Sequence, residues 1–423
     1  GAGKCRTKPN IVLITADTLR ADHLGCYGYP HAISPAIDSL AKKGTLFENA
    51  VTVIGKTSPA FVSMFTSRYP PETGARRNGI RMRPDMKTLT EVLKEQGYAT
   101  GAVISNWTLQ DHLCGLRKGF DVYESSFTRH RHGIMAKEKS ASIVTQNAVE
   151  LLNKLENEPF FLWIHYTDPH APYLKHEKYL LPGFTDDTKP PGWQKRRDYA
   201  SEIHYMDHWI GVFLQELYQH IDLADTHVFF FSDHGESLGE HGYWGHGQNV
   251  FQPNLHIPLI AAGPGWPENQ RLPNPVSIID LMPTILKTLD IRPPHALRGQ
   301  PLQNCLNNEN GIRRKRFAFA DRGVVLLKHA PKKEYKDPLS MCIISGGKKV
   351  IYHFEKHEYS WYDLVSDPEE LLPRTSLSEP NIRKMKTALS DWYSSLPHFE
   401  ADPDRELSEE DILQLESLGY ISR

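Results

Sequence analysis

The chain has 423 residues, of which 39% are hydrophobic and 24% are charged. This balance excludes a disordered or fibrous protein, and the length is sufficient for one large α/β domain with a smaller appendage. The 49 basic and 51 acidic residues nearly cancel, so the overall charge gives no sign of a nucleic-acid partner. No run approaches the roughly 18 apolar residues of a membrane span.

The predicted elements alternate between short apolar strands and helices. In chain order they are a strand over residues 10–15, helices over 36–43 and 87–96, strands over 99–104 and 160–166, a helix over 199–220 and a strand over 227–231. Continuous apolar strands separated by helices predict a large, mostly parallel sheet that helices flank on both faces. Such sheets bind ligands at the carboxyl ends of their strands.

The final quarter of the chain differs in pattern. Short β-like runs at residues 349–353 and 361–364 precede a helix over 380–396 and a charged tail. We therefore predict three parts, which are an N-terminal stub over residues 1–9, a catalytic α/β domain over 10–314 and a small sheet-plus-helix subdomain over 315–423. The stub is polar and lacks an initiating Met, so a removed leader or anchor is one interpretation of it.

The cysteines give no sign of a metal or redox motif. The five are scattered along the chain without short paired spacings, which argues against a zinc knuckle or a CxxC redox site. An odd count also leaves at least one thiol outside any disulfide within the chain.

Carboxylates follow three of the predicted strands. Asp17, Asp168 and Asp233 stand at strand ends, where a carboxylate either caps the next helix or serves as a ligand. His234 comes directly after Asp233, and the following loop carries further acidic residues and histidines up to His246. This density favours a metal site, with a histidine-rich surface loop as the alternative.

A hydroxyl group completes this set of candidate metal ligands. Thr57 precedes Ser58-Pro59 at the start of a helical stretch, where Thr and Pro are ordinary first-turn residues, although the same position directs backbone N–H groups at an anion. Two carboxylates, an imidazole and a hydroxyl are what a divalent cation needs to ionise an alcohol toward a phosphate or sulfate ester. We therefore predict a metallohydrolase with Asp17, Thr57, Asp233 and His234 as ligands.

Several segments resemble the sulfatases of the alkaline phosphatase superfamily. In chain order they are residues 10–20, 57–59, 66–70, 168–173, 232–235, 257–260, 279–286 and 361–370. This order over nearly the whole chain implies an alkaline-phosphatase-like α/β fold and a metal-dependent ester hydrolase. The resemblance also favours a periplasmic or secreted protein.

The nucleophile turn departs from the family pattern. Sulfatases carry a Cys or Ser that is converted to formylglycine in a Cys-x-Pro-x-Arg turn, whereas this chain has Thr57 at the first position and Phe61 in place of the Arg. We therefore expect no formylglycine.

Other departures resemble the phosphoesterase side of the superfamily. Thr18 and His234 stand where sulfatases have Asp and Asn, a lysine is missing near residues 105–107, and His246 replaces another lysine. Phosphonate monoester hydrolases pair Asp with His at the metal, and phosphodiesterases use a Thr nucleophile. Asn78 also falls where the phosphonate hydrolases place a residue that binds the substrate.

These resemblances imply a mechanism. The metal lowers the pKa of the Thr57 hydroxyl, which attacks phosphorus to form a phospho-threonine while Asn78 takes up negative charge. His170 or His246 contacts the substrate and protonates the leaving group, because an imidazole titrates near neutral pH; a structural role for His170 is the alternative. Mixed N/O ligation favours one Zn²⁺ or Mn²⁺, with Ca²⁺ also open. A second metal at Asp168 with either histidine is left open.

The expected substrate is a small anionic ester that is hydrolysed or transferred to an acceptor alcohol, and sugar- and lipid-linked esters are both consistent with the site. Two alternatives are a sulfate-ester hydrolase that uses unmodified Thr57 and a non-enzymatic protein that binds anions. We expect the loops over residues 127–139 and 173–195 either to cover the active-site cleft or to be solvated surface loops. The sequence leaves the oligomeric state undetermined.

Overall fold

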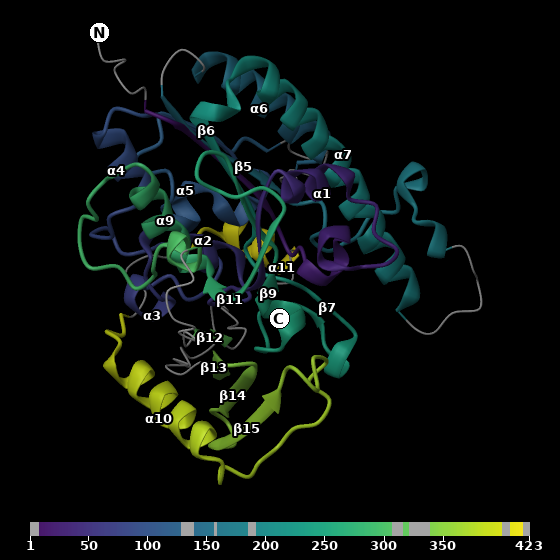
Figure 1. Ribbon diagram of the computed structural model, residues 1–423, viewed down its shortest axis with the longest axis vertical. Helices are drawn as coiled ribbons and strands as arrows, with labels where there is room; N and C mark the ends of the chain where they lie inside the picture. The colour runs from purple at the N-terminus through teal and green to yellow at the C-terminus, as the bar shows by residue number, and fades with distance from the viewer. Residues whose placement is uncertain are drawn as a thin grey trace.

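The computed structural model describes residues 8–127, 139–155, 159–184, 192–306, 316–320, 339–399 and 407–417. Figure 1 shows a large α/β body above a smaller antiparallel sheet. Most of the predicted stub, and most of the loop over 127–139, lie outside the described residues, as do residues 185–191 of the second loop. None of the described helices is long and apolar enough to cross a membrane.

The central sheet is mixed and mostly parallel. Within the described residues it has nine strands in the order β11-β2-β10-β6-β1-β5-β3-β4, with β9 paired to β2. The strands are β1 (Asn10–Ala16), β2 (Gly44–Val51), β3 (Ala99–Val103), β4 (Val122–Glu124), β5 (Phe160–Tyr166), β6 (Thr226–Ser232), β9 (His256–Ile257), β10 (Leu259–Ala262) and β11 (Gln270–Ser277). β1 is parallel to both β5 and β6, whereas β10 runs antiparallel between β6 and β2.

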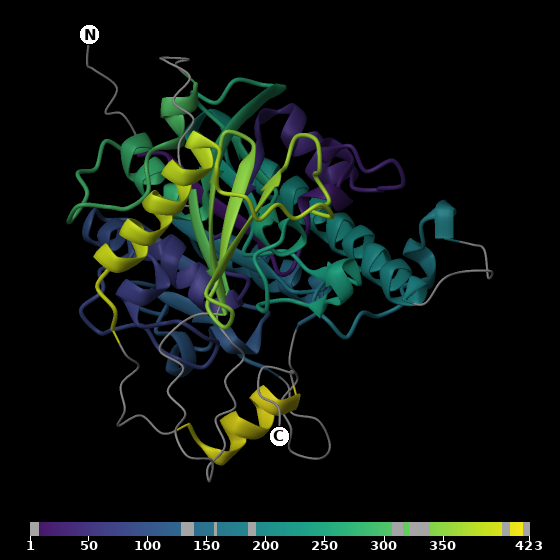
Figure 2. The same cartoon turned by 90° about the horizontal axis from the view of Figure 1, so that it is seen from below.

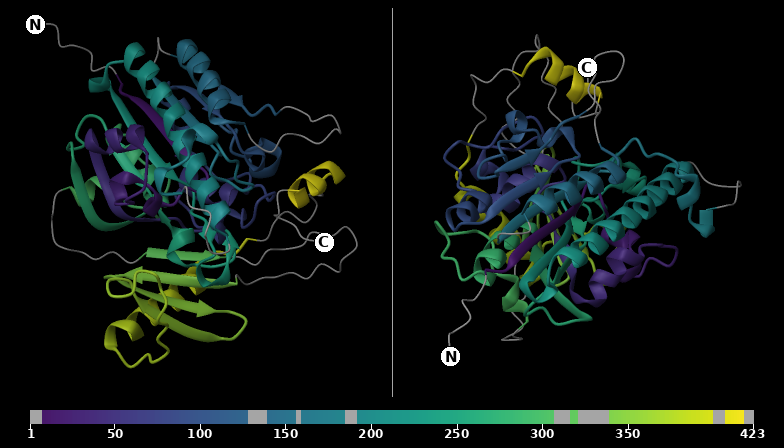
Figure 3. Two further views of the ribbon diagram at one scale, coloured as in Figure 1. Left: turned by 90° about the vertical axis from the view of Figure 1, so that its right-hand side faces the viewer. Right: turned by 90° about the horizontal axis from the view of Figure 1, so that it is seen from above.

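Helices cover both faces of this sheet because successive strand residues point to opposite sides. Ile11 and Leu13 of β1 belong to one core, and Val12 and Ile14 belong to the other. The first core contains residues from α2 (Thr57–Thr66), α4 (Leu89–Glu95) and α9 (Leu281–Thr288). The second contains residues from α1 (Pro35–Lys42), α6 (Ala141–Leu155) and α7 (Trp193–His220), and Figure 3 shows α6 and α7 side by side. The predicted α/β architecture is confirmed.

The chain also contains several short elements. They are α3 (Pro70–Thr73), the 3-10 helix η3 (Trp107–Leu109), α5 (Asp111–Cys114), β7 (Ser237–Leu238), β8 (Trp244–Gly245) and α8 (Gln252–Leu255).

The C-terminal part forms a separate antiparallel sheet, as predicted. It consists of β12 (Arg316–Ala320), β13 (Ser340–Ser345), β14 (Lys348–His353) and β15 (Glu358–Asp363), against which α10 (Pro380–Ser395) packs. The charged tail contains a helix that the sequence analysis did not predict, α11 (Glu409–Ser417). Figure 2 shows that α11 lies apart from α10.

Candidate active site

Parallel pairing brings the ends of β1 and β6 together. Ala16 is in register with Ser232, so Asp17 and Asp233 leave neighbouring strands at the same edge of the sheet. One ligand atom from each of Asp17, Asp233 and His234 lies within 4.8 Å of the others, and all three side chains are fully buried. Within the described residues, no other group of three His, Cys, Asp or Glu side chains meets this criterion.

Thr57 lies beside this cluster. It is the first residue of α2, a helix whose ten residues are all buried, so packing on every side fixes the position of its hydroxyl. Thr57 Oγ1 lies 3.4 Å from Asp17 Oδ1 and 3.3 Å from His234 Nε2. The structure therefore brings together all four predicted metal ligands.

The tautomer of His234 is set by the backbone. Its Nδ1 lies 2.9 Å from the carbonyl oxygen of Gly235, and because a carbonyl only accepts, Nδ1 carries the hydrogen. Burial, and then the charge of His246, lower the pKa of His234 to about 3. His234 is therefore neutral at physiological pH, and the lone pair on Nε2 is directed toward Thr57 and Asp233 Oδ2, which is 3.3 Å away.

The two carboxylates carry opposing pKa shifts. Burial and the negative charge of Asp17 raise the pKa of Asp233 well above its usual range. Burial would also raise the pKa of Asp17, but a hydrogen bond with His165 and the nearby imidazoles of His170 and His165 hold it below its usual value. Two facing carboxylates with only imidazoles as ion-pair partners in the described part of the chain form a site that a cation would stabilise.

Two further residues support Asp17, and the sequence analysis did not identify either of them. The Asn106 amide donates to Asp17 Oδ2 at 2.6 Å, and His165 Nε2 lies 3.3 Å from the same oxygen. Asn106 follows β3 and His165 is near the end of β5. The strand-end rule that selected the aspartates would have found both, had it been applied to amides and imidazoles as well.

Two predicted histidines lie beside the cluster. The His246 ring centroid is 4.5 Å from that of His234 and 5.3 Å from that of His170. His246 Nδ1 lies 3.2 Å from Glu236 Oε1, and the Glu236 side chain is fully buried. The structure thus brings His170 and His246 to the site, and it adds Glu236 as a residue that orients His246.

Asn78 reaches the first turn of α2. Its Oδ1 accepts hydrogen bonds from Ser58 N at 3.0 Å and Ser58 Oγ at 2.8 Å. Its Nδ2 is buried and has no hydrogen-bond partner among the described residues. The amide donor next to Thr57 is therefore available to an acceptor that a ligand would supply.

Asp168 acts at a different place. Its Oδ1 accepts a hydrogen bond from the backbone N–H of Ala141 at 3.0 Å, at the start of α6. Asp168 therefore caps α6, which precedes it in the chain, and not the next helix that the sequence analysis named as the alternative. Asp168 does not belong to the metal-ligand group found in the described part of the chain.

Comparison with known proteins agrees with this geometry. Residues 9–291 match the Sulfatase family model. The choline-sulfatase of Rhizobium meliloti is 26% identical, covering 88% of this chain and 83% of its own, and the ulvan-active sulfatase of Formosa agariphila is 25% identical, covering 77% and 69%.

Two solved structures show the same fold. A phosphonate monoester hydrolase from Agrobacterium radiobacter superposes with a TM-score of 0.75 at 20% identity, covering 92% of this chain and 95% of its own. A protein solved with its substrate D-glucosamine-2-N,6-O-disulfate superposes with a TM-score of 0.73 at 19% identity, covering 92% and 97%.

The fold and the buried cluster at the sheet edge define an ester hydrolase of the alkaline phosphatase superfamily. Within that superfamily, this chain belongs to the sulfatase family.

Proposed function

We propose that this sulfatase-family hydrolase cleaves phosphate or phosphonate esters, with Thr57 as the nucleophile. The observation that carries the proposal is the position of Thr57 Oγ1, 3.3 to 3.5 Å from His234 Nε2 and both Asp17 oxygens. Phe61 supports it, because the family motif has an arginine at this position. The Phe61 ring is fully buried and packs 4.9 Å from the Trp163 ring.

The residues fit one divalent metal ion. Two carboxylates, the Nε2 lone pair of His234 and the Thr57 hydroxyl would hold it, and this mixed N/O set suits Zn²⁺ or Mn²⁺ better than Ca²⁺. Such an ion supplies positive charge that neutralises the carboxylates and favours ionisation of the hydroxyl.

The chain supplies the remaining chemistry. Thr57 Oγ1 forms a bond to phosphorus as the bond between phosphorus and the leaving oxygen breaks, and this produces a phospho-threonine. Asn78 Nδ2 donates to a non-bridging oxygen of the phosphoryl group. Water, or an acceptor alcohol, then attacks phosphorus and releases Thr57.

His246 is the stronger candidate for the proton donor to the leaving oxygen. Glu236 Oε1 lies 3.2 Å from Nδ1 of this imidazole and orients it, as in an orienter–base pair. The His170 ring centroid lies 5.3 Å from that of His246, and we assign His170 to contact with the leaving group.

The test is a parallel rate assay of the metal-loaded protein on p-nitrophenyl phosphate, p-nitrophenyl phenylphosphonate and p-nitrophenyl sulfate. We expect faster cleavage of the phosphorus esters and a loss of at least about 10³-fold in Thr57→Ala. Thr288→Ala is the matched control, because Thr288 is a half-buried residue at the end of α9. Phosphorylated Thr57 should be detected in quenched reactions by peptide mass spectrometry.

The second candidate is a sulfate-ester hydrolase that uses unmodified Thr57. The curated relatives favour it, because a choline-sulfatase and an ulvan-active sulfatase are among them. Cleavage of the sulfate ester alone, without phosphorylated Thr57, would establish this candidate and overturn the phosphoesterase proposal.

A further inference from the structure

Thr18, which follows the candidate metal ligand Asp17, has a left-handed backbone conformation with a φ of 51°. This conformation is uncommon outside Gly, Asn and Asp, and it is unfavourable above all for a β-branched side chain. Thr18 is the one β-branched residue with a positive φ in the described part of the chain. Its hydroxyl is buried and has no hydrogen-bond partner among the described residues, so we looked to the backbone for what holds this turn.

The backbone of Thr18 is hydrogen-bonded through both of its polar groups. Its N–H donates to Asp233 Oδ1 at 3.2 Å, and its carbonyl accepts from the Tyr199 hydroxyl at 2.7 Å. The same hydroxyl accepts from the Arg20 N–H at 3.0 Å. Tyr199 therefore bridges the backbone of Thr18 and Arg20, within a turn whose N–H group is directed at the second candidate metal carboxylate.

This N–H helps to fix one oxygen of Asp233. Oδ1 accepts from the N–H of Thr18 and from the N–H of His234, which is 2.8 Å away. Oδ2 is buried and has no hydrogen-bond partner among the described residues, so it is the oxygen that an ion would take. Hydrogen bonds to a ligating carboxylate orient it and raise its affinity for metal.

Tyr199 is itself fixed by its surroundings. It lies on α7 and is fully buried. Its ring packs edge-on against the rings of His23 and Tyr173, with centroid separations of 5.2 and 5.4 Å. A buried ring in close packing has little freedom to move, so the hydroxyl is held at a fixed point beside the turn.

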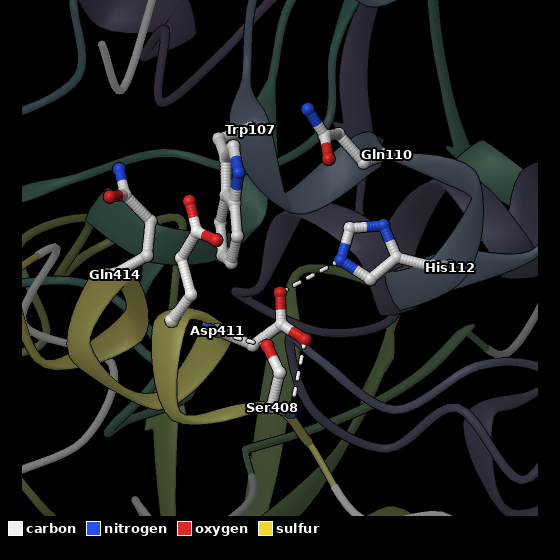
Figure 4. A pocket seen from close by; sticks show the side chains of 7 residues that line it. Trp107, Gln110, His112, Ser408, Asp411 and Gln414 are labelled. Carbon is white, nitrogen blue, oxygen red and sulfur yellow. Dashed lines mark hydrogen bonds and ion pairs between the residues drawn. The ribbon is translucent and has the colours of Figure 1, made fainter. Parts of the chain in front are cut away.

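The contact of Tyr199 is separate from the one that Asn106 makes. Asn106 donates to the Asp17 side chain from the segment that follows β3, where Trp107 lines a small cleft beside α11 (Figure 4). Trp107 and Tyr199 belong to different apolar clusters. Two distant parts of the chain thus support the carboxylate pair, one through a side chain and the other through the backbone.

We propose that Tyr199 is a positioning residue of the metal site, which holds Thr18 in the left-handed conformation that directs its N–H at Asp233. The inference rests on the metal site of the proposed function, but not on which ester Thr57 cleaves.

The first experiment measures Zn²⁺ affinity by competition with a chromogenic chelator, and thermal unfolding of the same samples reports stability. We expect Tyr199→Phe to weaken Zn²⁺ binding about 10- to 100-fold, the usual effect of losing a residue that orients a metal ligand. Gly adopts a positive φ without the cost that Thr has, so adding Thr18→Gly to Tyr199→Phe should restore most of the lost affinity. A merely structural role for Tyr199 would lower the unfolding temperature, and Thr18→Gly would not restore metal binding.

Tyr27→Phe is the matched control. The Tyr27 hydroxyl donates to the Phe47 carbonyl and accepts from the Leu259 N–H, both at 2.8 Å, so the change removes the same kinds of hydrogen bond. These partners lie on β2 and β10, which carry none of the candidate metal ligands, and we expect unchanged Zn²⁺ affinity. Equal losses in Tyr27→Phe and Tyr199→Phe would overturn the proposal, as would a double variant that binds Zn²⁺ no better than Tyr199→Phe alone.

The second experiment uses the wild-type protein and does not depend on the folding of any variant. If Tyr199 holds the turn, the amide hydrogens of Thr18 and Arg20 should exchange slowly even after a chelator has removed all metal. Fast exchange that slows only when Zn²⁺ is added would mean that the metal orders the turn, and would overturn the proposal. Wild-type protein that binds no Zn²⁺ would overturn the proposed metal site itself, whereas full affinity in Tyr199→Phe would overturn only the role of Tyr199.

Discussion

Asn106 links the end of β3 to the carboxylate cluster through one buried hydrogen bond to Asp17. Partners that orient a metal ligand affect metal affinity by about 10- to 100-fold. We therefore expect Asn106→Ala to weaken metal binding by that factor, as measured by competition with a chromogenic chelator. Asn49→Ala is the matched control, because the exposed Asn49 donates its amide to the Pro273 carbonyl oxygen, away from the carboxylate cluster. Equal affinities in the wild type and Asn106→Ala would contradict this role.

At the scale of single residues, the sequence predicted the candidate metal ligands better than the residues that support them. Asp17, Asp233 and His234 were predictable because charged groups rarely follow buried strands without a reason. Asn106 was missed because the segment around residues 105–107 was considered only for a missing lysine. His165 was missed because the strand end that carries it was considered only for Asp168 and His170.

Among the helices, α7 caps α1 through a buried carboxylate. Asp207 accepts hydrogen bonds from the backbone N–H groups of Ala36 at 3.0 Å and Ile37 at 2.9 Å. Burial raises the pKa of Asp207 to about 7, although these hydrogen bonds oppose the shift. The folded protein therefore keeps a proton that the unfolded chain releases above a pH of about 4.

This shift predicts that stability falls as the pH rises from about 4 to about 7, because the folded state binds more protons over that range. The contribution of Asp207 is at most about 1.4 kcal/mol per pH unit. Urea unfolding of the wild type and Asp207→Asn across this range should show a steeper decline in the wild type. The comparison uses the slope of the free energy of unfolding against pH, because Asn also loses one hydrogen-bond acceptor and this changes the absolute stability. Parallel slopes would show that Asp207 does not titrate in this range.

Local patterns predicted most elements but not their pairing. The strand over residues 160–166 has the predicted bounds, because both ends of the apolar run are sharp. The helix predicted over 199–220 in fact begins at Trp193. The prediction missed its first turns because they are polar and lack apolar periodicity. The antiparallel direction of β10 depends on contacts with β6 and β2, which are distant in the sequence.

Across the whole molecule, a buried ion pair joins the C-terminal sheet to the α/β body. Lys349 Nζ of β14 lies 2.5 Å from Glu370 Oε1 and donates to the Val250 carbonyl at 2.9 Å. Glu370 Oε2 accepts from the Gln252 N–H at 2.6 Å, at the start of α8. Both charged side chains are fully buried.

Removing one member should leave an uncompensated charge. We expect Glu370→Ala to lower the free energy of unfolding by about 3–5 kcal/mol, measured by urea unfolding. The neighbouring pair of Lys348 and Asp363 is partly exposed, so Asp363→Ala should destabilise the protein much less than Glu370→Ala. A double Lys349→Met/Glu370→Met variant should recover much of the loss. A loss below 1 kcal/mol in Glu370→Ala would contradict the account.

The sequence predicted that a smaller sheet follows the main domain, but it did not predict how the two are joined. The contacts of Lys349 with Val250 and of α11 with Trp107 connect segments roughly 100 to 300 residues apart. Neither has a local signature. The exact boundary after residue 314 and export from the cell both stay predictions.

The aromatic packing of Phe61 determines whether this core could accommodate the arginine of the family's Cys-x-Pro-x-Arg turn. The Phe61 ring, on the helix that begins at Thr57, lies 4.9 Å from the rings of both Trp163 and His165. Restoring the family's Cys-x-Pro-x-Arg turn would require a guanidinium in that space, and an unpaired buried charge is costly. A single change at Thr57 is therefore not expected to give the chain formylglycine chemistry, because several core residues would have to change with it.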